Sequence, residues 1–182
     1  MSLQPLSTRP GIPIMEATRR AQSQPLPFQL SLRIRHPSID PQSISRELQI
    51  EPEHSFQAGQ PRQLRSSVAP ATVHTESYWL AALNPATWFE NLSFPEAPTL
   101  ATAQKHIDAA VAQNLSGALG LCAVQFKSAH TALLHTIRSE GGEVSLLVTL
   151  SPTAVDTFTL PPQLSRIFGE LGITLEFEIT ND

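Results

Sequence analysis

A strict alternation of apolar and polar residues over 28–35 is the feature that most constrains the fold of this chain. Four apolar residues share one parity and four polar residues share the other: Phe28, Leu30, Leu32 and Ile34 against Gln29, Ser31, Arg33 and Arg35. Successive side chains of a strand point to opposite faces of its sheet. The segment therefore predicts a β-strand with one buried face and one polar face.

Three later segments repeat this two-residue period and predict further strands. Residues 77–83 place Trp79 on an apolar face, and residues 144–150 carry aliphatic side chains at every second position. The final segment, 173–180, alternates apolar residues with Thr and Glu. The four segments together predict a sheet of about four strands.

Helices are predicted between these strands by apolar residues three or four positions apart. They are expected at residues 41–49, along a stripe from Leu100 to Phe126, in a segment that ends at Gly141-Gly142, and from Pro162 to Leu171. Asp40 is a good capping residue, and Pro41 suits the first position of a helix. Gly117 and Gly120 favour a break or kink in the long stripe, because glycine costs a helix roughly 1 kcal/mol relative to alanine.

This order of elements predicts a single α+β domain with a mixed or antiparallel sheet, a split-βαβ-like arrangement, and helices packed on one face. The other face would be polar and partly open. Arg33 and Arg35 of the first strand and Glu176 and Glu178 of the last would attract one another on adjacent strands. We therefore predict that the first and last strands are neighbours.

Two segments fall outside this regular pattern. Residues 1–27 are rich in Pro, Ser and Gln, and they predict a disordered N-terminal arm ahead of a domain at 28–182. Residues 52–75 contain Pro and Gly without clear periodicity and predict a long loop. Such a loop is uncommon in a compact domain and often functional.

Composition excludes several classes of protein. Charged residues make up 15% of the chain and the net charge is −4, which argues against a nucleic-acid partner. No run approaches the roughly 18 apolar residues of a membrane span, so no membrane association is expected. The single cysteine, Cys122, cannot form an internal disulfide, and we expect a cytoplasmic location.

The segments LRIRHPSIDPQSISRELQIEP, FQAGQPR and ESYWL resemble those of the bacterial family called domain of unknown function 4279. The likeness covers roughly residues 28–180. Its motifs here are Ile44-Ser45, Gly59-Gln60-Pro61-Arg62 and Ser77-Tyr78-Trp79. The resemblance implies a fold and a bacterial origin, and it implies no reaction.

Four residues are candidates for ligand binding: Arg33, Arg35, Arg62 and Trp79. Arg62 follows Gly59 and Pro61, so its guanidinium could bind an anion through two hydrogen bonds, or it could hold the loop in place. Trp79 could stack on a ligand, or it could anchor the core. Arg33 and Arg35 could meet an anion on the polar face, or they could belong to an ordinary solvated surface.

Catalytic, metal and cofactor sites are not predicted. Two pairs of potential metal ligands that include a histidine lie close in the sequence, namely His130 with His135 and His106 with Asp108. Neither spacing places the two side chains of a pair on the same face of a helix. No glycine-serine elbow or phosphate-binding glycine motif is present.

Three classes of function remain as hypotheses. The first is a non-catalytic protein-interaction module, of immunity or regulatory type, that binds an unknown protein or a second copy of itself. The alternative is a small-molecule or anion-binding domain that uses the loop 52–75 and the polar sheet face. The third is a hydrolase-type enzyme, which would need distant His, Asp and Ser residues to converge.

Overall fold

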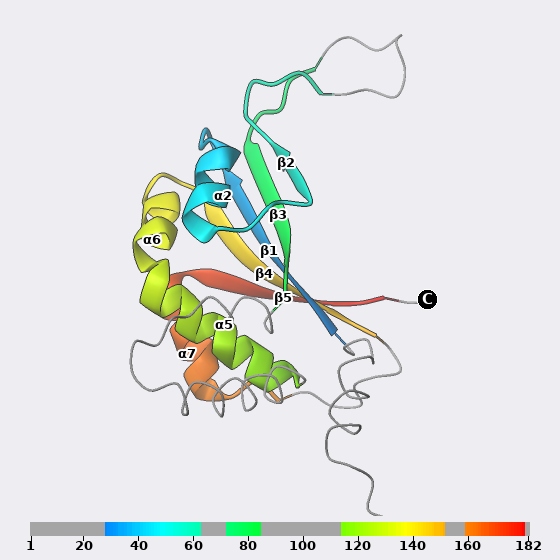
Figure 1. Cartoon of the computed structure of the whole chain (residues 1–182), viewed down its shortest axis with the longest axis vertical. Coiled ribbons are helices and arrows are strands. Elements are labelled where there is room, and N and C mark those ends of the chain that lie inside the picture. Colours follow the sequence, from blue (N-terminus) through cyan, green and yellow to red (C-terminus); the bar gives the residue numbers. More distant parts are fainter. Residues whose placement is uncertain (1–27, 63–71, 85–113, 152–158, 181–182) are drawn as a thin grey trace, which may run out of the picture.

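A computed structural model describes residues 28–62, 72–84, 114–151 and 159–180. These residues form one five-stranded sheet with helices, so the α+β prediction is confirmed with one strand more than expected (Figure 1). The elements in chain order are β1 (Phe28–His36), α2 (Pro41–Leu48), β2 (His54–Phe56), β3 (Ser77–Leu83), α5 (Leu115–Ala129), α6 (Thr131–Ser139), β4 (Glu143–Leu150), α7 (Pro162–Leu171) and β5 (Ile173–Ile179). The predicted arm at 1–27 lies outside the described residues.

The strand order is β2-β3-β1-β4-β5. β1 is the central strand and runs antiparallel to both β3 and β4. α7 joins β4 to β5, which are parallel and direct neighbours. The split-βαβ arrangement that the sequence predicts would place a third strand between two such strands, and no strand lies between β4 and β5. The prediction that the first and last strands are adjacent is wrong, because β4 lies between them.

Helices α2, α5, α6 and α7 share a single hydrophobic core with one face of the sheet. Leu32 and Ile34 of β1, Trp79 of β3 and Leu146 of β4 all belong to this core and are at most 1% exposed. We call this the covered face. The opposite face, which carries the other side chains of each strand, is called the open face.

Helix α2 forms where its capping residues predict it. Asp40 accepts a hydrogen bond from the Gln42 backbone N–H at 3.0 Å, and Pro41 occupies the first turn. Ile44 and Leu48, four positions apart, point into the core. Gln49 ends the helix in the left-handed conformation, with φ of 55°.

Helix α5 begins at the Asn114 side chain, which accepts a hydrogen bond from the Gly117 N–H at 2.7 Å. It continues through Gly120 to Ala129, so the predicted break does not occur at this glycine. The earlier part of the predicted stripe, residues 100–113, lies outside the described residues. No helix in the described part of the chain is both long enough and apolar enough to cross a membrane.

The turn from α6 into β4 requires a glycine. A Cβ atom at Gly142 would lie 2.6 Å from His36 Cδ2, 2.7 Å from Ile137 Cγ2 and 2.9 Å from the Arg35 carbonyl oxygen. The imidazole of His36 is itself fixed, because its Nδ1 accepts hydrogen bonds from the Ser38 and Ile39 N–H groups. Helix α6 ends just before this turn, where Gly141 has a positive φ of 86°, as the Gly141-Gly142 pair predicts.

Candidate functional site

The open face carries the two predicted arginines of β1. Arg33 is half-buried and Arg35 is exposed. Arg35 lies between Tyr78 of β3 and Glu143 of β4 in the strand register. Glu176 and Glu178 point to the same face from β5, two strands away from β1.

Arg33 and Glu176 form an ion pair across β4, although their strands are not adjacent. Ser145 of β4 is the register partner of Arg33 and lies between the two charged groups. Its short side chain leaves space for the two longer ones to meet above it, and its hydroxyl oxygen lies 3.5 Å from Arg33 Nη2. The attraction predicted between these charges is therefore present, but it does not determine the strand order.

The environment of Glu176 stabilises its charged form. A hydrogen bond with Ser145 is the main cause, and the Arg33 and Arg35 guanidinium groups add to it. Partial burial opposes these effects, and the net result is a lowered pKa for the Glu176 carboxyl. The centre of the open face is thus an internally neutralised ion pair.

A stack of three rings occupies the β2 side of the open face. The Phe56 ring lies 3.7 Å from that of His74 and 5.1 Å from that of Tyr78, at interplanar angles of 19° and 12°. The larger spacing is close to the distance of about 4.8 Å between neighbouring strands. The small interplanar angles show that the rings pack against each other through their faces.

Sequence reasoning missed this stack because β2 has only three residues and lies inside the predicted loop. A strand so short has too few positions to show an alternation. The available signal was Phe56, which is the one aromatic residue of Phe, Trp or Tyr type in the segment 52–75.

Arg62 lies away from the other two arginines. After β2 the chain continues into an antiparallel ribbon, in which the Arg62 N–H donates to the Thr72 carbonyl and Pro61 forms a bridge with Val73. This ribbon projects beyond the sheet (Figure 1). The structure therefore brings Arg33 and Arg35 together but places Arg62, which is exposed, on a separate part of the molecule.

Trp79 lies on the covered face and is completely buried. Its indole N–H donates a hydrogen bond to the Ser45 hydroxyl of α2 at 3.0 Å. This contact ties the helix to β3. Of the two roles weighed for Trp79, the geometry is that of a core anchor with a satisfied polar atom.

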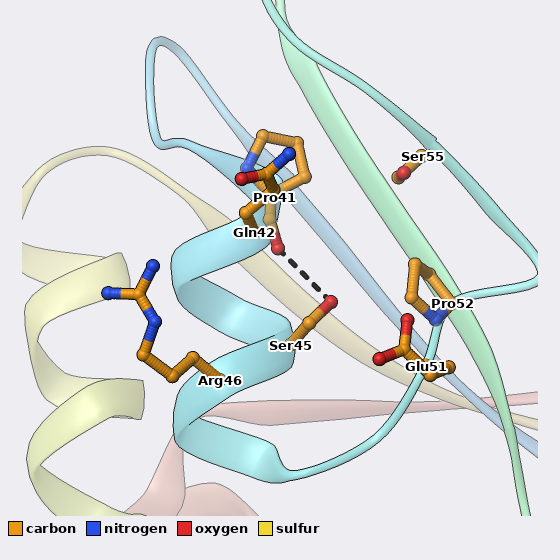
Figure 2. A pocket seen from close by; sticks show the side chains of 7 residues that line it. All are labelled: Pro41, Gln42, Ser45, Arg46, Glu51, Pro52 and Ser55. Carbon is orange, nitrogen blue, oxygen red and sulfur yellow. Dashed lines mark hydrogen bonds between the residues drawn. The ribbon is translucent and has the colours of Figure 1, made fainter.

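A polar groove lies between α2 and the segment that leads into β2 (Figure 2). Its volume is about 490 Å³, and it is lined by Pro41, Gln42, Ser45, Arg46, Glu51, Pro52 and Ser55. Figure 2 shows Arg46 on the side of α2 turned away from Glu51 and Ser55. Glu51 and Ser55 line one side of the groove with oxygen atoms, whereas the Ser45 hydroxyl on α2 already donates a hydrogen bond to the Pro41 carbonyl oxygen and accepts one from Trp79.

Two observations concern thiol and metal chemistry in the described part of the chain. Burial raises the pKa of the Cys122 thiol to about 12, so this group is not a reactive thiolate near neutral pH. Residues 28–62, 72–84, 114–151 and 159–180 contain no group of three or more His, Cys, Asp or Glu side chains placed to hold a metal ion. His106, one of the six histidines, lies outside these ranges.

Comparison of the whole chain with protein-family models, curated proteins and solved structures finds no match.

Proposed function

We propose that this chain is a non-catalytic protein-interaction domain, of immunity or regulatory type, whose docking surface is the open face of its sheet. The observation that carries this proposal is the ring stack of His74, Phe56 and Tyr78 beside Arg35. Tyr, Phe and Arg are enriched in protein interfaces and often supply most of the binding energy. The resemblance to a bacterial family and a cytoplasmic location remain parts of the proposal.

The charge arrangement also favours a macromolecular partner. Arg33 and Glu176 neutralise each other, so a partner can cover the centre of the face without leaving either charge unpaired. Arg35 is exposed and forms no ion pair with another described residue, so it is available to a carboxylate of the partner. The surface to be covered is a sheet face, which suits the broad contact area of a protein interface.

Two substitutions on the open face test this proposal, Tyr78→Ala and Arg35→Glu. A partner is captured with the wild-type protein, identified by mass spectrometry, purified, and measured by isothermal titration calorimetry. We expect each variant to weaken binding at least about tenfold, because truncation of an interface anchor costs more than about 1.4 kcal/mol.

Arg46→Glu on α2 is the matched control, because it reverses an exposed arginine away from the open face. The proposal fails if the purified partner binds all three variants with the wild-type Kd. It also fails if only Arg46→Glu weakens binding, since the interface would then lie on the helical side.

A second candidate function is the binding of a small polar molecule in the α2 groove. The volume of about 490 Å³ lies within the range of ligand sites, roughly 300–1,000 Å³. The Glu51 carboxylate and the Ser55 hydroxyl favour a ligand with ammonium or hydroxyl groups, such as an amine or a polyol.

Thermal-shift measurements with a panel of polyamines, amino acids and sugars test this candidate. Glu51→Gln should abolish any ligand-induced increase in Tm, whereas Arg35→Glu on the open face should preserve it. An increase that survives Glu51→Gln would place the ligand elsewhere and remove this function from consideration.

A further inference from the structure

A cleft between α6 and α7 is separate from both the open face and the α2 groove. Its volume is about 380 Å³, which lies within the range of ligand sites, roughly 300–1,000 Å³. Positions three or four residues apart on α6 share one face of that helix and form the longer wall. The lining residues are Thr131, His135, Arg138 and Ser139 of α6 and Glu170 and Leu171 of α7. We call this the α6–α7 cleft.

Arg138 is the arginine of this cleft, and packing holds its side chain in place. A Cβ atom at Gly172 would lie 2.2 Å from Arg138 Cδ, 2.2 Å from its Nη1 and 2.3 Å from its Nε. The side chain therefore lies directly over the glycine at the turn from α7 into β5. The guanidinium forms no hydrogen bond or ion pair with another described residue. An unpaired guanidinium can bind a carboxylate or phosphate through two parallel hydrogen bonds.

The carboxylate on the opposite wall has its own partners. Glu170 Oε2 lies 3.4 Å from Lys127 Nζ, and its Oε1 lies 3.7 Å from Arg166 Nε. With Arg138, three cationic side chains thus stand against one carboxylate here, in a chain whose net charge is −4. The C-terminal end of α6 adds a partial charge of only about −0.5, which is smaller than the full charge of one guanidinium. The cleft therefore favours an anion.

The hydroxyl groups of the cleft define the rest of the ligand. Thr131 Oγ1 donates a hydrogen bond to the Lys127 carbonyl at 2.8 Å, and Ser139 Oγ donates one to the Thr136 carbonyl at 2.9 Å. A hydroxyl has a single hydrogen, so both oxygens can meet a ligand only as acceptors. A ligand that satisfies them must bring hydrogen-bond donors of its own. Hydroxyl groups supply such donors without adding a positive charge beside Arg138.

We propose that the α6–α7 cleft binds a small anion with several hydroxyl groups. Its phosphate or carboxylate group meets the Arg138 guanidinium, and its hydroxyl groups meet Thr131 and Ser139. Thr131 and Arg138 are seven positions apart, or about 10 Å along the helix axis, so a ligand that reaches both has a chain of several carbon atoms. This inference goes beyond the proposed protein-binding function and uses no residue of the open face.

Glucose 6-phosphate and gluconate are the probes, because they join several hydroxyl groups to a phosphate and to a carboxylate respectively. Inorganic phosphate and glucose are the matched controls, since each offers only one half of the recognised chemistry. Each compound is titrated into the full isotope-labelled chain and followed by NMR. We expect at least one of the two probes to shift the amide signals of residues 131–139 and 170–172 in a saturable way. We expect that probe to bind about tenfold or more tightly than phosphate or glucose alone.

Substitution of Arg138 tests which group meets the anion. Arg138→Gln should weaken binding of the probe about tenfold or more, because it removes charge-assisted hydrogen bonds. Arg138→Lys should cause a smaller loss, since it keeps the charge but not the planar fork. Arg46→Gln, which changes an exposed arginine on α2, should leave the affinity unchanged. Circular dichroism checks that all three variants fold.

Three results would each overturn the inference. The first is that neither glucose 6-phosphate nor gluconate binds more tightly than inorganic phosphate. The second is that the amide shifts fall outside the α6–α7 cleft. The third is that Arg46→Gln weakens binding as much as Arg138→Gln, which would indicate a general attraction to positive charge.

This inference and the proposed function can fail separately. Tyr78→Ala and Arg35→Glu on the open face should not change the affinity for the probe, and Arg138→Gln should not change the affinity for a purified partner. Glu51→Gln, which removes the carboxylate of the α2 groove, should also leave probe binding in the α6–α7 cleft unchanged.

Discussion

The first and last strands of the domain have the same kind of sequence and very different surroundings. Both alternate apolar and polar residues along their length. In β1 every residue of the apolar parity, from Phe28 to His36, is buried. In β5 burial decreases along the strand, and Phe177 and Ile179 are 45% and 64% exposed.

The difference teaches that alternation determines which face a side chain joins, but not how deeply it is buried. β1 has a hydrogen-bonded neighbour on each side, whereas β5 has a described neighbour on one side only. A central strand is covered by the side chains of both neighbours as well as by the helices, and an edge strand lacks half of this cover. Two strands with the same sequence pattern can therefore contribute different amounts to the free energy of folding.

The largest expected contrast comes from truncation of one apolar side chain in each strand. Leu32→Ala in β1 should lower the free energy of unfolding by about 2–5 kcal/mol, because it leaves a cavity in a fully buried core. Ile179→Ala in β5 should change it by no more than about 1 kcal/mol, since most of that side chain is already in water. Urea unfolding followed by circular dichroism measures both. Equal losses would show that the end of β5 is covered in solution.

The glycines that precede β4 and β5 give a second contrast. Gly142→Ala should cost about 1–3 kcal/mol, because the new Cβ meets the Arg35 backbone oxygen and the His36 ring, which cannot move freely. Gly172→Ala should cost about 1–2 kcal/mol, mainly because its φ of 69° disfavours a side chain.

The two glycines differ in what crowds them. The contacts at Gly172 are with the Arg138 side chain, which can be removed. The stability lost in Gly172→Ala should therefore fall in the double variant with Arg138→Ala, measured by the same unfolding assay. If Gly172→Ala costs as much stability with Arg138→Ala as without it, the whole effect comes from the backbone conformation of residue 172.

Acid titration probes the link between β1 and β5. The pKa of Glu176 is lowered in the folded state, so the folded protein binds fewer protons than the unfolded chain as the pH falls below about 4.3. Stability from this group is complete above that pH and is lost as the pH falls through the lowered pKa. Glu176→Gln should make the urea midpoint less dependent on pH in this window, and Ser145→Ala should do so partially. If the urea midpoint depends on pH in both variants as it does in the wild type, the Ser145 hydrogen bond does not lower the pKa of Glu176.

The smallest effect is expected at Glu178. Glu178→Gln should change the free energy of unfolding by less than about 0.5 kcal/mol, because the side chain is exposed and has no partner among the described residues. A large loss of stability would mean that the Glu178 side chain has a structural partner.

Much of the fold could be predicted from local sequence. Asp40 and Pro41 predict the start of α2, Gly172 predicts the end of α7, and alternation predicts the faces of β1 and β3. These signals are local, since capping and strand parity depend on residues a few positions apart. β2 escaped prediction because three residues carry too little pattern.

The candidate site was less predictable than the fold. Arg33 and Arg35 were recognised as open-face residues, but the position of Arg62 depends on where its ribbon leaves the sheet, and the face of Trp79 depends on the register of β3 against β1. The ring stack joins Phe56 of β2 to His74 and Tyr78 of a second segment, which is separated from the first by residues 63–71. No periodicity within one segment could reveal it.

The sequence by itself determined the class of the domain, the boundaries of most elements and the face to which each strand residue points. Only the tertiary structure decided that β4 separates β1 from β5, that Arg33 nevertheless meets Glu176 above Ser145, and that Trp79 bonds to Ser45 instead of facing solvent. The physical reason is that alternation and capping are short-range, whereas strand order depends on burial of the whole core. A surface ion pair contributes too little free energy to override that choice.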